Sequence, residues 1–485
     1  MGVFSILLTV SLFKYYLGQE NSQSEIWGPG LQPDVIVMPA RYFFLRILNN
    51  RCSEKLLDVN IEGTTFGKRN CRIWKNILNT RNCTFIVRYK LYETCANLKI
   101  SIKYDNVDIG ESPYIIKNRV YYEGCDCPQT NLNKWLHNWE CGEVSKQIIE
   151  DLSIFKSINF EVLREKIIAT YNSPGSISLC HYVIKNNKIH RRCYGKYVGF
   201  KMFMDNILLS LSRKLLLPDV EFFVNLGDWP LVKKATNNFP IFSWCGSTDT
   251  FDIVMPTYDI TESTLENMGR VTMDILSVQG NIQHDWKDRL PIAFWKGRDS
   301  NRERLHLIEL ARNNPHLFNV SLTNFFFFRS EEDQYGPKTE HTSFFKFFDY
   351  KYQLTIDGTV AAYRVPYLLA GGSLVIKQKS KYYEHFYNEL IPDTHYVSVE
   401  NDLSDLVEKI KWALNNDAQA KTMADAGRTF VNNKLLPQNI FCYHVHLLKE
   451  FSNRIASRIE ILENMELVKK EETNCECYHN IRNEL

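Results

Sequence analysis

Three short loops in this 485-residue sequence carry the residues best suited to chemistry. Each follows an apolar run that is typical of a buried strand, over residues 220–225, 291–295 and 352–356. In open α/β sheets, ligands bind beyond the carboxyl ends of such strands. The three loops are therefore the candidates for a ligand site.

The first loop is Asn225-Leu226-Gly227-Asp228-Trp229-Pro230. The carboxylate of Asp228 suits a general base, because apolar neighbours keep its pKa from falling too low. The alternative is an aspartate that caps the next turn, as many aspartates after strands do. Spacing alone favours the capping interpretation.

The second loop runs from Trp295 through Gly297 to a helix that we expect to begin near Ser300. Arg298 and Arg304 then lie near a helix N-terminus, where backbone N–H groups favour phosphate. Arginine can also contact phosphate oxygens with two parallel hydrogen bonds. The alternative is a solvated basic helix face that is paired with Glu303.

The third loop is Asp357-Gly358-Thr359-Val360-Ala361-Ala362-Tyr363-Arg364. We expect a helix start here, with Arg364 about one and a half turns in and Gly371-Gly372 at the helix end. Small residues at a helix start let a ligand approach the backbone. No P-loop and no G-x-G-x-x-G motif occurs, so a plain βαβ unit with a capped helix is equally open.

Alternating strands and helices surround these loops from residue 121 to 470. We expect helices over residues 145–155, 199–215 and 403–414, the last capped by Asn401 or Asp402. A hairpin is expected around Asn186-Asn187, and a fourth buried strand over residues 374–377. This pattern predicts parallel sheets covered on both faces. About 350 residues exceed one doubly wound domain, so we expect two facing α/β lobes with a cleft between them.

Residues 25–120 have a different pattern, with short β-branched and aromatic runs separated by turn residues. We expect strands over residues 35–38, 42–47, 85–89 and 98–104. About seven strands in this length suggest an immunoglobulin-like sandwich. No cluster of catalytic residue types occurs in it, so its expected role is partner binding or spacing.

Composition argues against a largely disordered chain and against a nucleic-acid-binding protein. With 44% hydrophobic and 24% charged residues, most of the chain is globular, and a net charge of +2 leaves no broad surface for nucleic acid. The 13 cysteines form no zinc-ribbon array. They fit a disulfide framework in an oxidising compartment, and their odd number leaves at least one thiol outside it.

Both ends of the chain indicate a compartment. The apolar run at residues 3–13 is too short to span a bilayer but suits a signal peptide over residues 1–18; the alternative is a buried N-terminal element. The tail at residues 471–485 ends in Arg-Asn-Glu-Leu, which is similar to the K-D-E-L retrieval signal. We therefore expect the tail to bind the retrieval receptor of the endoplasmic reticulum. Asn82 and Asn319 lie in glycosylation sequons. Together these features predict the endoplasmic reticulum lumen, with no membrane span.

The sequence contains no D-x-D pair, which many metal-dependent sugar-nucleotide enzymes use. Two arginines could instead neutralise a leaving diphosphate. We therefore expect a GT-B-like transferase without metal or cofactor. No Ser-His-Asp or Cys-His arrangement is readable, and His385 and His395 are expected to be structural.

Several motifs resemble the glycosyltransferase family 90 catalytic domain. They are Cys245–Thr250, Val254–Tyr258, Trp295–Ser300, Asp357–Arg364 and Tyr382–Tyr387. The segments around Gly28–Leu31, Thr84–Tyr89 and Ser112–Tyr114 resemble a filamin-type repeat. With its K-D-E-L-like tail, the chain resembles the KDEL-motif-containing protein O-glucosyltransferases over residues 25–485.

The resemblance implies an inverting transfer of glucose from UDP-glucose to serine in folded EGF-like repeats of Notch-type proteins. It implies Asp228 as the base and a donor site at Arg298, Arg304 and Gly358–Arg364. Lys296 departs from the family's usual arginine and loses a two-pronged contact. The resemblance also implies that the segment from Cys125 to Cys141 is disulfide-bonded internally and to Cys442. A UDP-xylose-dependent transferase and a non-catalytic client-binding factor are the alternatives.

Overall fold

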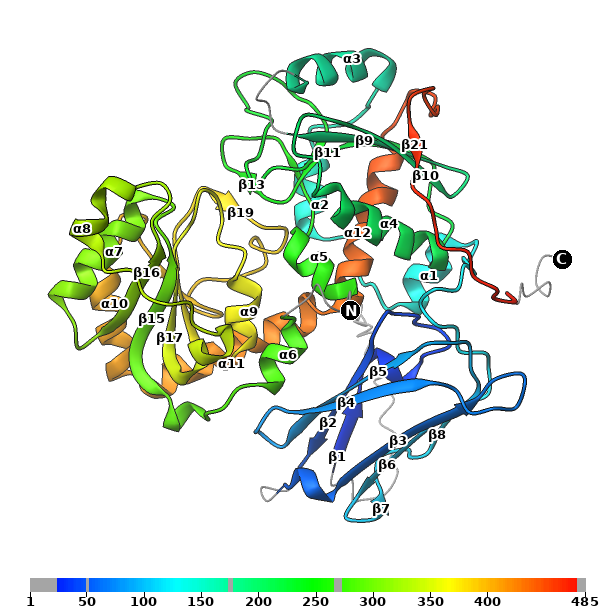
Figure 1. The fold of residues 1–485 in the computed structure, drawn as a ribbon, viewed down its shortest axis with the longest axis horizontal. Helices are drawn as coiled ribbons and strands as arrows, with labels where there is room; N and C mark the ends of the chain where they lie inside the picture. The colour runs from blue at the N-terminus through cyan, green and yellow to red at the C-terminus, as the bar shows by residue number, and fades with distance from the viewer. Residues whose placement is uncertain (1–23, 49–51, 173–177, 266–272, 478–485) are drawn as a thin grey trace, which may run out of the picture.

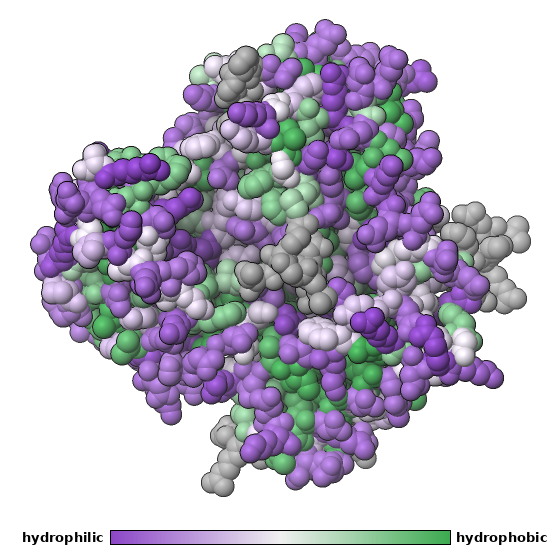
Figure 2. Space-filling model, viewed as in Figure 1, coloured by the Kyte–Doolittle hydropathy of each residue, from purple (hydrophilic) through white to green (hydrophobic). Residues whose placement is uncertain are grey.

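The computed structural model describes residues 24–48, 52–172, 178–265 and 273–477. They form an N-terminal β module and two α/β lobes, shown in Figure 1. The expected signal segment at residues 1–18 and the terminal residues 482–485 lie outside the described part. No helix within the described part is long and apolar enough to cross a bilayer. Hydrophilic side chains cover most of the face shown in Figure 2.

The β module is a sandwich of two antiparallel sheets, as predicted. Phe43 and Val87 of one sheet share a buried core with Val59 and Ile100 of the other. Its described residues form eight strands. The first sheet has the order β1 (Ser24–Trp27), β2 (Arg41–Ile47), β5 (Thr84–Leu91) and β4 (Ile73–Asn79); the second contains β3 (Leu57–Thr64), β6 (Ala96–Tyr104) and β7 (Val107–Asp108), with β8 (Tyr114–Ile116) also on β6.

One predicted strand of the module is wrong. Residues 35–38 form turns and bends after a short 3-10 helix, Pro29–Leu31. Ile36 and Met38 are buried in the core cluster that includes the first lobe. Their apolar character reflects burial against another body of the protein, which hydrophobicity cannot distinguish from burial in a sheet.

The first lobe has a mixed six-stranded sheet, so the prediction of parallel sheets is only partly right. The predicted hairpin turns at Asn186 and Asn187, where φ is 50° and 59°, and it pairs antiparallel with the buried strand β11. Only β11, β12 and β14 run parallel. The sheet order is β14 (Ile253–Val254), β12 (Ile241–Ser243), β11 (Val220–Asn225), β9 (Leu179–Lys185), β10 (Lys188–Tyr194) and β21 (Glu466–Leu467).

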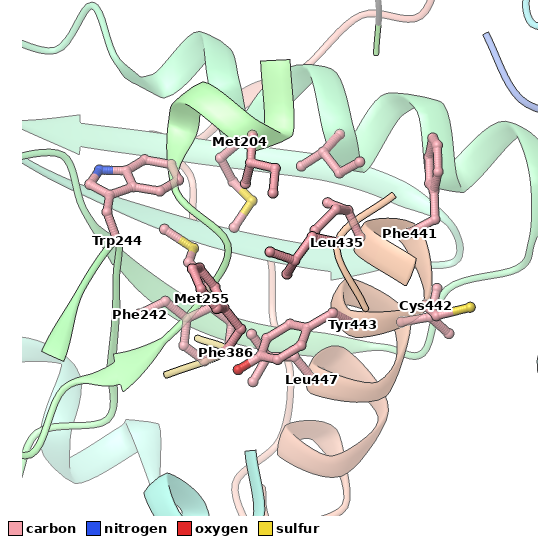
Figure 3. Close-up of a cluster of buried hydrophobic side chains, with 14 of the residues drawn as sticks. Met204, Phe242, Trp244, Met255, Phe386, Leu435, Phe441, Cys442, Tyr443 and Leu447 are labelled. Carbon is pink, nitrogen blue, oxygen red and sulfur yellow. The ribbon is translucent and has the colours of Figure 1, made fainter. Parts of the chain in front are cut away.

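Six helices surround this sheet and complete its core. Figure 3 shows Met204, Trp244, Met255, Tyr443 and Leu447 gathered in that core, from segments that are far apart in the sequence. The helices are α1 (Leu132–Asn138), α2 (Lys146–Leu152), α3 (Phe160–Tyr171), α4 (Lys201–Lys214), α5 (Tyr258–Leu265) and α12 (Pro437–Ser452).

The second lobe has a fully parallel five-stranded sheet with helices around it, as predicted (Figure 1). Its order is β16 (Phe318–Asn324), β15 (Leu290–Arg298), β17 (Tyr350–Thr355), β18 (Leu374–Gln378) and β20 (Val397–Val399). Its helices are α6 (Ile275–Gly280), α7 (Arg302–Asn313), α8 (Glu332–Tyr335), α9 (Val365–Ala370), α10 (Leu406–Asn415) and α11 (Asp417–Lys434).

Two helix starts differ from the predictions. Arg364 is the N-cap of α9 rather than a residue one and a half turns inside, because residues 359–363 form bends and turns. Helix α10 begins at Leu406 after Asp405, so neither Asn401 nor Asp402 caps it. Leu403 has a φ of 61°, which a right-handed helix does not allow.

The two lobes are connected by a short pair of strands and by the passage of the chain from one lobe to the other. Strand β13 (Gly246–Ser247) lies between β12 and β14 of the first lobe in the chain. It pairs antiparallel with β19 (Tyr382–Tyr383), which lies between β18 and β20 of the second lobe. A Cβ atom at Gly246 would lie 2.5 Å from the Tyr383 ring, so the close approach requires glycine. The chain then returns from α11 under the second lobe to α12 in the first (Figure 1).

The β module contacts both lobes. Tyr42 and Phe44 are buried in the first lobe's core cluster. On the other side, Arg88 of β5 forms a 3.0 Å salt bridge with Asp274, the N-cap of α6. A Cβ atom at Gly280 of α6 would collide with the side chain of Leu78, so this contact is close. The module is therefore packed against both lobes.

The predicted disulfide framework is confirmed, and Cys245 is the free, buried thiol. The expected bond from the segment 125–141 to Cys442 is confirmed and is formed by Cys141, but the expected bond within that segment is wrong. Cys125 and Cys127 bond instead to cysteines 350 residues away and attach the C-terminal segment to the linker after the module. The bonds are Cys52–Cys83, Cys71–Cys95, Cys125–Cys475, Cys127–Cys477, Cys141–Cys442 and Cys180–Cys193.

Candidate functional site

A cavity of about 930 Å³ lies between the two lobes. The first lobe contributes the loop after β11 and helix α5, and the second contributes the loops after β15 and β17. The structure thus brings the three predicted loops to one cleft. All ten predicted catalytic and donor-site residues line it: Asp228, Arg298, Arg304, Gly358, Thr359, Val360, Ala361, Ala362, Tyr363 and Arg364.

The loop that carries Asp228 is fixed by its neighbours. The side chain of Asn225 accepts a hydrogen bond from the Gly227 N–H at 2.8 Å. The carbonyl of Asp228 accepts one from the hydroxyl of Tyr363 in the second lobe, at 3.4 Å. Asn225 therefore caps this turn, and the carboxylate of Asp228 is left for the cleft.

The environment of this carboxylate suits proton transfer. It accepts a hydrogen bond from the Tyr258 hydroxyl at 3.3 Å. Burial raises the pKa of Asp228, while the bond from Tyr258 and the charge of Arg298 limit the rise. Asp259 also lines the cleft, and burial together with the charge of Asp228 raises its pKa to about 6. A carboxylate with a raised pKa is a stronger base than an exposed one.

Arg304 lies at the first turn of α7 and is 5% exposed. Its guanidinium donates to three backbone carbonyls, those of Asp357 (2.7 Å), Arg298 (3.0 Å) and Ile356 (3.0 Å), and to the hydroxyl of Ser300 (3.1 Å). Four of its five N–H groups are therefore engaged within the protein. The interpretation of Arg304 as part of a solvated basic face is wrong, and the side chain holds two cleft loops together.

The backbone of the third loop passes close to the side chain of Arg304 at Gly358. A Cβ atom there would lie 3.3 Å from Nη2 of Arg304, so the glycine leaves room for that guanidinium. Asp357, just before it, accepts a hydrogen bond from the Ser380 hydroxyl, and burial raises the pKa of Asp357 to about 6. The small side chains of the residues that follow line the cleft.

Two arginines present positive charge to the cleft. Arg298 is exposed, at the end of β15. Arg364 donates through Nη1 to the carbonyl of Lys296 at 2.8 Å, and burial lowers its pKa to about 10, so it stays protonated at neutral pH. Lys296 itself donates to the hydroxyl of Thr342 at 2.8 Å. Arginine charges at these positions suit a phosphate-bearing ligand.

Sequence reasoning missed several residues that line the cleft. Tyr258, Asp259 and Glu262 come from α5, and Thr342 and Phe344 come from the segment before β17. Tyr258 closes a motif that the family resemblance already included, but no pattern showed that its hydroxyl reaches Asp228. The other residues carry no local signal, because only the packing of the lobes places them at the cleft.

The structure shows other predicted sites without testing them. Asn82 and Asn319 of the two sequons are both exposed. His385 is buried, which lowers its pKa to about 3. The Nδ1 atom of His395 accepts the N–H of Ile391 at 2.9 Å. No group of three or more metal-ligating side chains occurs in residues 24–48, 52–172, 178–265 and 273–477.

Comparisons with protein families match both parts of the chain. The model described as "Glycosyl transferase family 90" matches residues 136–485 and thus includes both lobes. The model described as "Filamin/ABP280 repeat" matches residues 20–115, the β module.

Similar curated proteins cover nearly the whole chain. Protein O-glucosyltransferase 2 of Danio rerio is 46% identical over 458 residues, which cover 93% of this chain and 91% of that protein. Protein O-glucosyltransferase 3 of Homo sapiens is 43% identical over 473 residues, covering 94% and 92%. Protein O-glucosyltransferase 1 of Homo sapiens is 28% identical over 349 residues, covering 68% and 86%.

Proposed function

Because the chain belongs to glycosyl transferase family 90 and carries an N-terminal filamin repeat, we propose that it is a protein O-glucosyltransferase. The donor would be UDP-glucose, and the acceptor would be a serine of a folded EGF-like repeat of a Notch-type protein. The names of its relatives support glucosyl transfer to protein. The acceptor and donor follow from the resemblance of its motifs. One observation carries the proposal: Asp228 faces Arg298 and Arg364 across a single cleft.

The proposed reaction is a single displacement. Asp228 accepts the proton of the serine hydroxyl while the serine oxygen forms a bond to C1 of the sugar. The bond from C1 to the diphosphate oxygen breaks, and UDP leaves with the bonding electrons. Attack opposite to the leaving group inverts the configuration at C1. One carboxylate is enough, because UDP leaves readily once its charge is countered.

In the proposed reaction, residues of the second lobe stabilise the negative charge on the leaving diphosphate. Arg298 is exposed to the cleft, and Arg364 is held there by one hydrogen bond to a backbone carbonyl. We assign the diphosphate contacts to these two guanidiniums, which can stabilise the charge that develops as the bond breaks. Arg304 adds its positive charge, and its hydrogen bonds hold the loops after β15 and β17 in position. Because these guanidiniums can counter the charge of the diphosphate, we propose that the reaction needs no metal ion.

The proposed compartment is the lumen of the endoplasmic reticulum. Twelve of the thirteen cysteines are disulfide-bonded, which supports an oxidising environment. The apolar run at residues 3–13 and the C-terminal Arg-Asn-Glu-Leu sequence favour entry into the lumen and retrieval to it.

The test is sugar transfer to a purified, folded EGF-like repeat, with the product read by intact mass. UDP-glucose and UDP-xylose are offered separately, with and without EDTA. We expect a gain of one hexose that EDTA does not change. A gain of one pentose would move the donor to UDP-xylose, and a loss of activity in EDTA would contradict metal independence. If several folded repeats gained no sugar, a client-binding factor would replace the transferase.

A further inference from the structure

Four consecutive phenylalanines follow β16, and they divide into two pairs. Phe325 and Phe328 are directed to the core of the second lobe, where Phe325 is 9% exposed. Phe326 and Phe327 lie outside, with exposed fractions of 57% and 49%. Their rings meet edge to face, with centroids 5.2 Å apart. We call these two exposed residues the aromatic platform.

The backbone of the platform is held by a buried carboxylate. Asp299 is fully buried, and its two oxygens accept the N–H groups of Phe326 (2.7 Å), Phe327 (2.9 Å) and Phe328 (2.6 Å). Hydrogen bonds to a charged acceptor are about twice as strong as neutral ones. These hydrogen bonds fix the backbone that carries the two exposed rings. A pre-ordered surface binds a partner with less loss of entropy.

The platform comes directly after a chain segment that lines the cleft. Thr323 and Asn324, which directly precede the phenylalanine run, line the cavity, and so do Arg298 and Ser300 on either side of Asp299. On the other lobe, Trp229 is 46% exposed beside Asp228. On each lobe, exposed aromatic residues therefore follow, within a few positions in the sequence, residues that line the cavity.

We propose that the aromatic platform docks the folded protein acceptor, an inference that rests on the proposed function. A serine must reach Asp228 on the first-lobe wall, so a folded domain that presents it extends over the rim of the second lobe. The platform fits an apolar patch on that domain. The guanidinium of Arg329 lies 5.5 Å from the centroid of the Phe326 ring and favours an acidic side chain at the edge of the patch.

The test compares the double variant Phe326→Ser/Phe327→Ser with a matched control. Phe66→Ser serves as that control, because Phe66 is 53% exposed on the β module and also has an arginine over its ring. Initial rates are measured against folded repeat at saturating UDP-glucose, and UDP binding is measured by calorimetry. We expect the platform variant to raise the KM for the repeat roughly tenfold, the effect of losing a modest interface anchor. We expect kcat and the Kd of UDP to change less than twofold, and the control to behave like the wild type.

Other outcomes would overturn the inference. An unchanged KM would show that the acceptor does not touch the platform, and a weakened UDP affinity would show that it only supports the donor wall. If the wild type were a dimer and the platform variant a monomer, the platform would be reassigned to self-association. If the double variant lost thermal stability, Phe327→Ser alone would be measured in the same way. Absence of transfer by the wild type would instead refute the proposed function, and this inference with it.

Discussion

Replacing Arg304 with lysine separates the two roles that this side chain could have. The substitution keeps one positive charge but removes the planar fork that reaches three carbonyls. If Arg304 mainly supplies charge to the diphosphate, lysine should preserve much of the UDP affinity. If it mainly holds the loops at Arg298 and Asp357, lysine should destabilise the second lobe.

The structure gives the size of the effect. The Asp357 carbonyl also accepts a hydrogen bond from the Asn301 side chain at 2.9 Å, so it keeps a donor in the variant. One ammonium group can satisfy about one of the other two carbonyls, which leaves about one buried oxygen without a donor. Such an oxygen costs about 1–3 kcal/mol, so the free energy of unfolding should fall by about 1–3 kcal/mol. Loss of the contact between Arg304 and the Trp295 ring, 5.2 Å away, adds about 1 kcal/mol. Burial lowers the pKa of Arg304 to about 9, and this unfavourable desolvation persists with lysine.

The assay is thermal unfolding with and without UDP, followed by calorimetry of UDP binding. A total loss of about 3 kcal/mol corresponds to a fall in Tm of about 9 °C for a lobe of this size. Arg304→Lys should show that fall, and saturating UDP should recover part of it. A Tm within about 2 °C of the wild type, together with a nearly unchanged affinity for UDP, would refute the loop-holding role and favour the charge role.

Two further predictions concern pH. Tyr258→Phe removes a hydrogen bond that favours the charged form of Asp228, so the acid limb of kcat/KM should move to higher pH; an unmoved limb would show that Asp228 is not the titrating base. Burial lowers the pKa of His385 to about 3 and of His444 to about 4. Because both histidines gain protons near pH 6.5 only when unfolded, their contribution to stability is full above that pH and falls by up to about 1.4 kcal/mol per unit for each below it. Buried carboxyls such as Glu384, whose pKa is raised to about 8, act in the opposite direction, so the test is the difference between variants. From pH 7.5 to 5, the Tm of the wild type should fall relative to that of His385→Gln, and equal slopes would contradict this assignment.

The sequence predicted the positions of the cleft residues better than their interactions. Asp228, Arg298 and Gly358 each follow an apolar run that ends at a loop, and the carboxyl ends of the parallel strands within one sheet lie at the same edge. The packing of the two lobes then brings the edges of both sheets to one cleft. The role of Arg304 could not be read in this way, because its partners lie both beside it and more than 50 residues away. A guanidinium that binds phosphate and one that binds carbonyls have the same local sequence.

Other features depend on contacts between bodies of the protein. Residues 35–38 have the composition of a strand but are buried against the first lobe. Cys125 pairs with Cys475 across 350 residues, and spacing gives no information on such a bond. Tyr258 reaches Asp228 only because α4, α5 and β11 pack into one core.

The most direct test of the account compares Asp228→Asn with the wild type in two measurements on the same samples. Asparagine keeps the size and the acceptor oxygen of the side chain but cannot take the serine proton. We predict that hexose transfer to the folded repeat falls by at least a thousandfold, while the Kd of UDP changes less than threefold. Near-normal transfer by Asp228→Asn would show that another group is the base and would contradict the central claim.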